Sequence, residues 1–171
     1  LNDLLAQRVA RWPRETFVET KAEDGSWTPR SATQFDADVV AVAKGLVARG
    51  IEPGDSVGIM SRTRYEWTLL DFAIWAAGAV PVPLYETSSA DQVEWILTDA
   101  AVRLLVVESD EHAETVGQVR ASCPALGDVL VIDAGALDTL RAEGAEVSDD
   151  EIARRRAVAA PADLATIIYT S

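Results

Sequence analysis

The pattern of apolar and polar positions alternates between helical and strand spacing along most of the chain. The helical spacing predicts helices over 32–48, 64–77, 111–121 and 136–143, with others after Asn2, Ser89 and Ser148. Short, mostly β-branched runs predict buried strands over 56–60, 79–84, 104–107, 129–133 and 163–171. Such alternation favours a largely parallel, twisted sheet covered by helices. The expected fold class is α/β, in one layered unit over residues 1–171.

Local signals mark where several of these elements begin. Capping boxes, in which a hydroxyl residue is followed three positions later by Gln or Glu, are predicted at 31–34, 63–66 and 89–92. Segments 16–20 and 26–29 flank an Asp-Gly pair, which is typical of a β-hairpin tip. Two prolines within 79–84 predict a short or irregular strand there.

The composition describes an acidic globular chain with a net charge of −13 and a pI near 4.4. This charge repels nucleic acid and anionic lipid, so we expect no nucleic-acid partner. The short basic run 154–156 is interpreted as a solvated helical face. No apolar stretch approaches the roughly 18 residues of a membrane span, and no secretory signal pattern is present. We expect a cytoplasmic location, and leave peripheral contact with a membrane open.

The residues alone do not assemble an active site. Neither a dinucleotide-binding glycine motif nor a Walker A motif occurs, and no Cys/His cluster has metal spacing. The single cysteine, Cys123, and the single histidine, His112, form no recognisable nucleophile–base pair. Carboxylates are concentrated at helix starts, where capping and the helix dipole explain them. We therefore assign no catalytic and no metal-binding residue.

The ordered set of segments 26–28, 50–59, 75–85 and 167–171 carries more information than any of them alone. Together they resemble the N-terminal part of the adenylate-forming (acyl-CoA synthetase, AMP-binding) superfamily, over essentially the whole chain. Within that superfamily, segments 64–67 and 83–89 look most like the long-chain fatty acid–CoA ligases. The fold that this implies is the N-terminal subdomain of the adenylate-forming enzymes, without a complete catalytic domain.

The resemblance implies an ATP- and Mg²⁺-dependent ligase with fatty acid and coenzyme A as further substrates. The acid would attack the α-phosphate of ATP to give acyl-adenylate and pyrophosphate, and the thiol of coenzyme A would then displace AMP. Tyr169, Thr170 and Ser171 correspond to the entry of the family's phosphate-binding loop, whose glycines and lysine would follow residue 171. We therefore expect a fragment that is inactive by itself and binds no cofactor.

Two further groups are weighed as site residues. Arg62 and Arg64 follow a predicted strand end, where ligands gather in open α/β sheets, and they are candidates for contacts to coenzyme A phosphates. Ordinary surface arginines are the competing interpretation. The aromatic residues Trp67, Phe72 and Trp75 of helix 64–77 could line an acyl channel, although packing in the core or against another domain is favoured.

Two alternatives to the long-chain ligase stay open at this point. The longer protein could transfer its acyl-adenylate to a carrier protein or activate another carboxylic acid. The chain could also be a free-standing α/β binding module that never had a phosphate loop. Because helix 64–77 is apolar nearly all round, we further expect exposed apolar surface and weak self-association.

Overall fold

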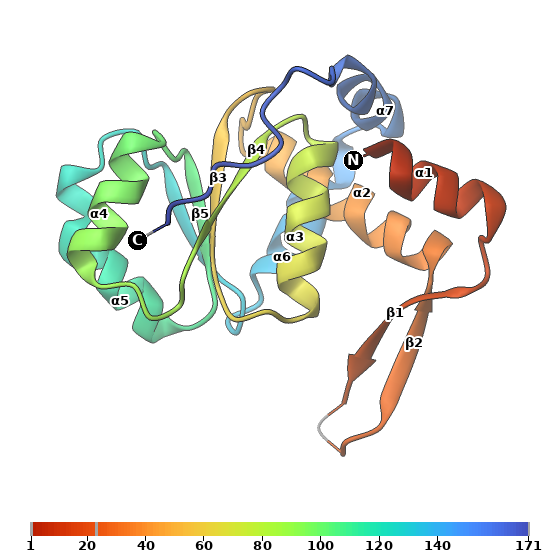
Figure 1. Ribbon diagram of the computed structural model, residues 1–171, viewed down its shortest axis with the longest axis horizontal. Helices are drawn as coiled ribbons and strands as arrows, with labels where there is room; N and C mark the ends of the chain where they lie inside the picture. Colours follow the sequence, from red (N-terminus) through yellow and green to blue (C-terminus); the bar gives the residue numbers. More distant parts are fainter. Residues whose placement is uncertain (1, 23, 171) are drawn as a thin grey trace.

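A computed structural model describes residues 2–22 and 24–170, and Figure 1 shows their arrangement. A short helix and a two-stranded hairpin precede a helix-covered sheet. The elements are α1 (Asn2–Arg11), β1 (Thr16–Lys21), β2 (Trp27–Ser31), α2 (Ala32–Ala48), β3 (Ser56–Met60), α3 (Tyr65–Ala76), β4 (Val80–Leu84), α4 (Ala90–Asp99), β5 (Leu104–Val107), α5 (Asp110–Val119), η1 (Arg120–Ser122), β6 (Asp128–Val131), α6 (Ala136–Glu143), η2 (Gly144–Glu146) and α7 (Asp149–Val158).

The four-stranded sheet has the order β4-β3-β5-β6, and each neighbouring pair of strands is parallel. Helices α2, α3 and α6 cover one face, while α4 and α5 cover the other (Figure 1). All residues of the two central strands, β3 and β5, are buried, because helices lie on both sides of them. The predicted α/β class, with a largely parallel sheet covered by helices, is confirmed.

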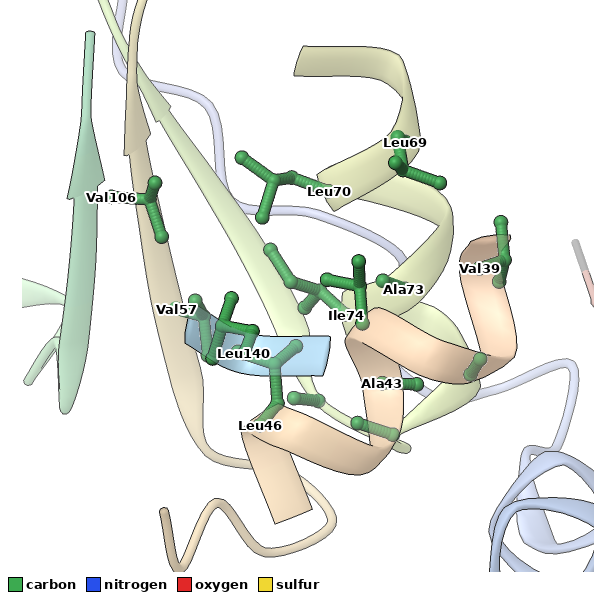
Figure 2. Packing of buried hydrophobic residues seen from close by; sticks show 14 of the residues in the cluster. Val39, Ala43, Leu46, Val57, Leu69, Leu70, Ala73, Ile74, Val106 and Leu140 are labelled. Atoms are coloured by element: carbon green, nitrogen blue, oxygen red, sulfur yellow. The ribbon is translucent and has the colours of Figure 1, made fainter. Parts of the chain in front are cut away.

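The larger core lies between the sheet and helices α2, α3 and α6, as Figure 2 shows. Each fully buried large aliphatic or aromatic side chain contributes about 1.5–3 kcal/mol of transfer free energy. Helices α2 and α6 approach so closely that a methyl group on Gly45 would overlap the backbone of Leu140. The most enclosed large side chains of this core are Phe35, Leu46, Ile59, Leu69, Leu70, Ile74, Leu104, Leu140 and Ile152.

A second core fills the opposite face, between the sheet and helices α4 and α5. Alternate residues of each strand point into it, which is the two-residue period of a strand buried on both faces. Cys123 is buried at its margin, as expected of an unreactive cysteine. Its other buried members include Met60, Val82, Leu84, Val93, Leu97, Leu105, Val107, Val116 and Val119.

Two of the three predicted capping boxes are present. The hydroxyls of Ser31 and Ser89 each accept a hydrogen bond from the backbone N–H three residues later. The side-chain oxygen of the glutamine at that later position accepts from the backbone N–H of the serine, at 2.9 Å in both cases. The box predicted at 63–66 is wrong. The N-cap of α3 is Arg64, one residue after the predicted Thr63, and its guanidinium has no acceptor for a backbone N–H. Glu66 binds that guanidinium at 2.7 Å.

Strand β4 is more regular than its two prolines suggested. It pairs with β3 from Val80 to Leu84 without interruption. Val80 donates toward the β3 side, to the Asp55 carbonyl, so the alternate residues Pro81 and Pro83 face the outer edge of the sheet. A proline is tolerated there because a residue that faces the outer edge has no neighbouring strand to which its N–H would donate. The expectation of a short or irregular strand was therefore wrong.

The final segment, 163–170, is not the buried strand that the sequence predicted. It is extended and largely exposed, and one backbone bond joins it to β4, from the Ile167 N–H to the Pro81 carbonyl at 3.2 Å. The outer edge of β4 lacks the N–H groups of its two prolines, so it cannot form a ladder with another strand. Ser171 lies outside the described residues.

The interpretation of the basic run 154–156 as a solvated face holds for Arg154, which is exposed, and is wrong for Arg155. Arg155 is 3% exposed, and its guanidinium donates to the backbone carbonyls of Ile51 and Ala77 at 2.7 and 3.2 Å. These carbonyls lie just after α2 and α3, where unsatisfied acceptors and the negative ends of the helix dipoles favour a cation. Arg155 therefore fastens α7 to the ends of both helices. Within the described residues, no helix is long and apolar enough to cross a membrane.

Candidate functional site

The strand order places a topological switch point at the carboxyl ends of β3 and β5. The chain leaves β3 through α3 on one face of the sheet, and it leaves the neighbouring strand β5 through α5 on the other face. Open α/β sheets bind ligands where adjacent connections diverge in this way. The residues that follow β3 and β5 are therefore the first place to look for a site.

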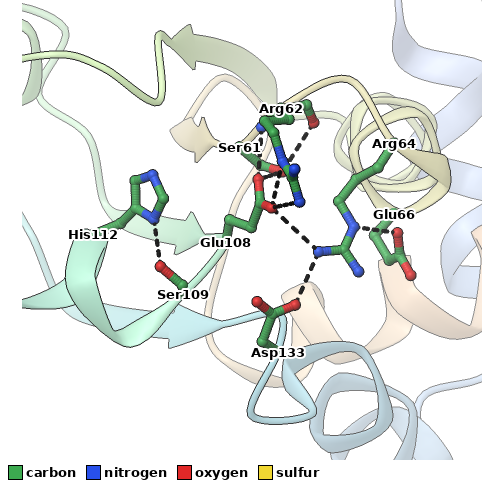
Figure 3. Close-up of polar contacts among 8 residues, drawn as sticks. All are labelled: Ser61, Arg62, Arg64, Glu66, Glu108, Ser109, His112 and Asp133. Atoms are coloured by element: carbon green, nitrogen blue, oxygen red, sulfur yellow. Dashed lines mark hydrogen bonds and ion pairs between the residues drawn. The ribbon is translucent and has the colours of Figure 1, made fainter.

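A buried carboxylate joins these two strand ends. Glu108, 5% exposed, directly follows β5 and accepts from the backbone N–H and the Nε of Arg62, both at 2.8 Å (Figure 3). The Ser61 hydroxyl donates to it at 3.1 Å. Burial raises the pKa of Glu108, but the bonds from Arg62 and Ser61 outweigh it and lower the pKa to about 2. Glu108 is therefore ionised at neutral pH.

Arg64 lies beside this pair and is surrounded by carboxylates (Figure 3). Its guanidinium contacts Glu66 at 2.7 Å, Asp133 at 2.9 Å and Glu108 at 3.6 Å. The hydrogen bond that Arg64 donates to Glu66 is the largest cause that raises the pKa of Arg64, and the bond that it donates to Asp133 is a smaller one. The arginine thus links the ends of β3, β5 and β6. Its charge is already neutralised by the protein.

The two predicted arginines differ in their access to a ligand. The side chain of Arg62 is 70% exposed, whereas that of Arg64 is 29% exposed. An anion that approached Arg64 would have to compete with its three carboxylates, which is costly for a polyanion. Arg62 has one carboxylate partner and an open flank.

A polar cleft of about 850 Å³ opens beside Arg64, between the hairpin and the start of α6. Four cations and four carboxylates line it, so it carries no net charge to attract a phosphate. Trp27, from the hairpin, is 59% exposed at its rim. The charged lining residues are Glu19, Lys21, Arg30, Arg64, Glu66, Asp133, Asp138 and Arg141.

His112 and Cys123 do not form a reactive pair. The Ser109 hydroxyl and the Nδ1 of His112 are 2.7 Å apart within the first turn of α5 (Figure 3). Cys123 is buried, and its sulfur lies 3.9 Å from the Thr98 hydroxyl. Across residues 2–22 and 24–170, no group of three or more His, Cys, Asp or Glu is placed to hold a metal ion.

The predicted phosphate-loop entry lies away from the arginines. The Tyr169 hydroxyl donates to Asp99 at 2.6 Å, and Asp99 ends α4, close to the start of β5 and thus to the amino ends of the strands. Burial is the largest cause, and the bond to Asp99 a further one, that raises the pKa of Tyr169 to about 12. Thr170 is exposed. The structure therefore does not bring Tyr169 and Thr170 together with Arg62 and Arg64.

The aromatic side chains of α3 are packed into the fold. Phe72 makes edge-to-face contacts with Phe35 and Trp75, with ring centroids 5.4 and 5.3 Å apart. Trp67 packs against the larger core. None of the strongly exposed large apolar side chains of the described chain lies on α3, contrary to the expectation for helix 64–77. They are Leu4, Trp12, Trp27, Tyr85, Trp95, Val158, Leu164 and Ile168.

The acidic partners of the two arginines and of Tyr169 were not predicted from the sequence. Glu108 immediately follows an uninterrupted apolar strand, so the strand-end rule that selected Arg62 also points to it. Asp133 follows the next strand in the same way. No sequence signal marks Asp99 as the partner of Tyr169, because the contact joins positions 70 residues apart.

Comparisons with known proteins agree with the fold. The family model described as AMP-binding enzyme matches residues 5–171. Two relatives, both named long-chain-fatty-acid–CoA ligase FadD15, come from Mycobacterium bovis and Mycobacterium tuberculosis, and each is 47% identical over 151 residues. The match covers 86% of this chain and 25% of either relative. The chain thus spans about a quarter of the length of these relatives.

A solved structure gives the same picture at lower sequence identity. A long-chain-fatty-acid-CoA ligase from Archaeoglobus fulgidus, FadD1, superposes with a TM-score of 0.82 over 99% of this chain and 34% of that one. The two sequences are 21% identical, so this likeness concerns the fold. The family model, the relatives and the fold agree, and the chain belongs to the AMP-binding enzyme family.

Proposed function

We propose that this chain forms the N-terminal part of a long-chain fatty acid–CoA ligase. The observation that carries the proposal is the 47% identity, over 86% of the chain, to two proteins named as such ligases. The longer polypeptide would convert fatty acid, ATP and coenzyme A into acyl-CoA, AMP and pyrophosphate. In the first step a carboxylate oxygen bonds to the α-phosphorus and pyrophosphate leaves. In the second, the thiol of coenzyme A displaces AMP.

Within this proposal, Tyr169 and Thr170 lead into the segment that binds the ATP phosphates. Backbone N–H groups and hydroxyls of such a segment neutralise phosphate charge without a covalent step. Ser171 would continue it and lies outside the described residues. Mg²⁺ would arrive with ATP and offset the charge of the leaving pyrophosphate, and we assign none of the described residues as its ligand.

Arg62 is the better of the two candidates for a coenzyme A phosphate. Its exposed guanidinium could bind a phosphate while it keeps its bond to Glu108, whereas Arg64 is enclosed by carboxylates. The contact stays a prediction. Replacement by lysine, which lacks the planar fork but keeps the charge, would test it through the KM for coenzyme A alone.

The proposal is tested by fatty-acid-dependent exchange between pyrophosphate and ATP. We expect the complete polypeptide to catalyse this exchange with palmitate and Mg²⁺, and the 171-residue chain alone to be inactive. Exchange that requires a short or aromatic acid instead of palmitate would redirect the proposal to another acid-activating enzyme. An acyl-adenylate that forms but is not transferred to coenzyme A would indicate a carrier-protein acceptor. Turnover by residues 1–171 alone would contradict the assignment of the phosphate-binding segment.

A further inference from the structure

The segment 163–170 crosses the edge of the sheet instead of continuing it. It passes from the side of α3 to the side of α4, across the outer edge of β4 (Figure 1). On the α3 side, the indole Nε1 of Trp75 donates to the Ala165 carbonyl at 2.6 Å. At the strand, the Pro81 carbonyl accepts from the Ile167 N–H at 3.2 Å. The first anchor is therefore a side chain of a core helix.

The second side-chain anchor lies on the opposite face. The Tyr169 hydroxyl donates to Asp99 at 2.6 Å, and the Tyr169 ring packs against the smaller core. A bond to a charged acceptor is stronger than one between neutral groups. Asp99 is the last residue of α4, where the helix dipole disfavours a negative charge. Helix stability alone therefore does not account for an aspartate at this position.

Backbone hydrogen bonds to β4 contribute little to holding segment 163–170. Pro81 and Pro83 remove the N–H groups that the outer edge of β4 would otherwise present. The strand offers one acceptor, the Pro81 carbonyl, which takes the Ile167 N–H and, at 3.0 Å, the Thr166 hydroxyl. On either side of this contact, the course of the segment depends on its bonds to Trp75 and Asp99.

Trp75 is itself held firmly. Its ring stacks edge-to-face on Phe72, and Phe72 in turn contacts Phe35 of the larger core. Its backbone carbonyl accepts from the Asn2 side-chain amide at 3.1 Å. Because Trp75 is fixed by the larger core, its bond to Ala165 holds the segment at a defined place relative to that core.

We propose that Trp75 and Asp99 are positioning residues for the nucleotide site, because they fix the course of residues 165–169 and hence the place where the phosphate-binding segment begins. The inference rests on the proposed function of that segment. Neither residue touches the reacting atoms. Loss of either anchor would let the segment sample more conformations, and ATP would have to restore its order on binding. The fatty acid would not.

Four variants of the complete polypeptide separate this role from a purely structural one. Trp75→Phe removes the indole N–H but keeps an aromatic ring on Phe72. Asp99→Ala removes the acceptor for Tyr169, whereas Asp99→Asn keeps an acceptor oxygen. Trp95→Phe is the matched control, because Trp95 is an exposed tryptophan on α4, 65% accessible. Asp99 is exposed, so its replacement does not threaten folding.

The KM values, the amide hydrogen exchange and the melting temperature are measured for each variant. Trp75→Phe and Asp99→Ala should raise the KM for ATP in pyrophosphate exchange by about two- to tenfold, the range expected for one hydrogen bond, with the KM for palmitate unchanged. Both should also speed amide hydrogen exchange in residues 163–170 without ATP. Asp99→Asn, which keeps a neutral acceptor, should have a smaller effect than Asp99→Ala. Trp95→Phe should behave like the parent protein, and Asp99→Ala should keep its melting temperature.

The outcomes distinguish the inference from the proposed function. If the parent protein catalyses exchange and both anchor variants keep its KM for ATP and its amide protection, the positioning role is wrong. Equal rises in the KM values for ATP and palmitate, with a lowered melting temperature, would show a structural role only. If the parent protein shows no palmitate-dependent exchange, the proposed function fails, and the amide exchange still decides whether Trp75 and Asp99 hold the segment.

Discussion

Glu108 accepts two hydrogen bonds from Arg62, one from its backbone N–H and one from its Nε, and each is 2.8 Å long. The pair joins the carboxyl ends of β3 and β5 at the point where their connections diverge. A buried carboxylate bound to both a backbone amide and a guanidinium holds the two strand ends in a fixed geometry.

The first prediction concerns the acid sensitivity that Glu108 confers. Its folded-state pKa of about 2 lies below the ordinary value near 4.5, so the stability that it contributes is present above about pH 4.5 and is lost as pH falls toward 2. Glu108→Gln should lower the melting temperature at pH 7 and flatten its decline between these two pH values. Glu114→Gln, on the exposed side of α5, should leave the decline unchanged. A melting curve series from pH 2 to 7 checks both.

Asp71, on α3, should make stability depend on pH in the opposite direction to Glu108. Burial raises its pKa to about 6, so the folded chain holds more protons than the unfolded chain between about pH 4 and 6. Stability should accordingly fall as pH rises through this window. Asp71→Asn should raise the melting temperature at pH 7 and have little effect at pH 4. A lower melting temperature of the variant at pH 7 would show that the charge is stabilised by a contact.

Gly45 sets the spacing between α2 and α6. A methyl group there would overlap the backbone of Leu140, which cannot move without shifting α6. Gly45→Ala should therefore destabilise the fold by about 1–3 kcal/mol or more. Gly117, in the last turn of α5, has open space around it, so Gly117→Ala should stabilise by up to about 0.5–1 kcal/mol. Urea unfolding of both variants measures the contrast, and equal effects would contradict the close approach.

Arg155 should be far more important than its neighbour Arg154. Replacement of Arg155 by methionine leaves the carbonyls of Ile51 and Ala77 without their donor in a buried setting, at an expected cost of about 3 kcal/mol. Arg154 is exposed and paired with Glu151 within its own helix, so Arg154→Met should change the melting temperature much less. The interpretation of 154–156 as a solvated face would instead predict similar small effects for both.

Local and periodic signals predicted most of the fold. The helix at 32–48 has a capping box and a period of apolar residues that agree, and the structure has α2 over the same residues. The apolar run 104–107 likewise became the buried strand β5. The box predicted at 63–66 failed because the N-cap of α3 is Arg64, one residue later, whose guanidinium binds Glu66, a contact that spacing alone does not reveal.

The site was harder to predict because its partners are distant in sequence. Arg62 and Arg64 were selected by their place after a strand, but Glu108 and Asp133 reach them only when the strands lie side by side. The strand expected at 163–171 depended on a neighbouring edge able to donate, and the prolines of β4 deny it that partner. Apolar patterning shows which residues prefer burial. It does not show whether a partner edge is available.

The most direct test of the proposed function is the product formed by the complete polypeptide from palmitate, ATP, Mg²⁺ and coenzyme A. We predict palmitoyl-CoA, with AMP and pyrophosphate released in equal amounts, measured by chromatography and mass spectrometry. Omission of palmitate should abolish the release of AMP. Formation of ADP and phosphate in place of AMP and pyrophosphate, or release of AMP that does not depend on a fatty acid, would contradict the account.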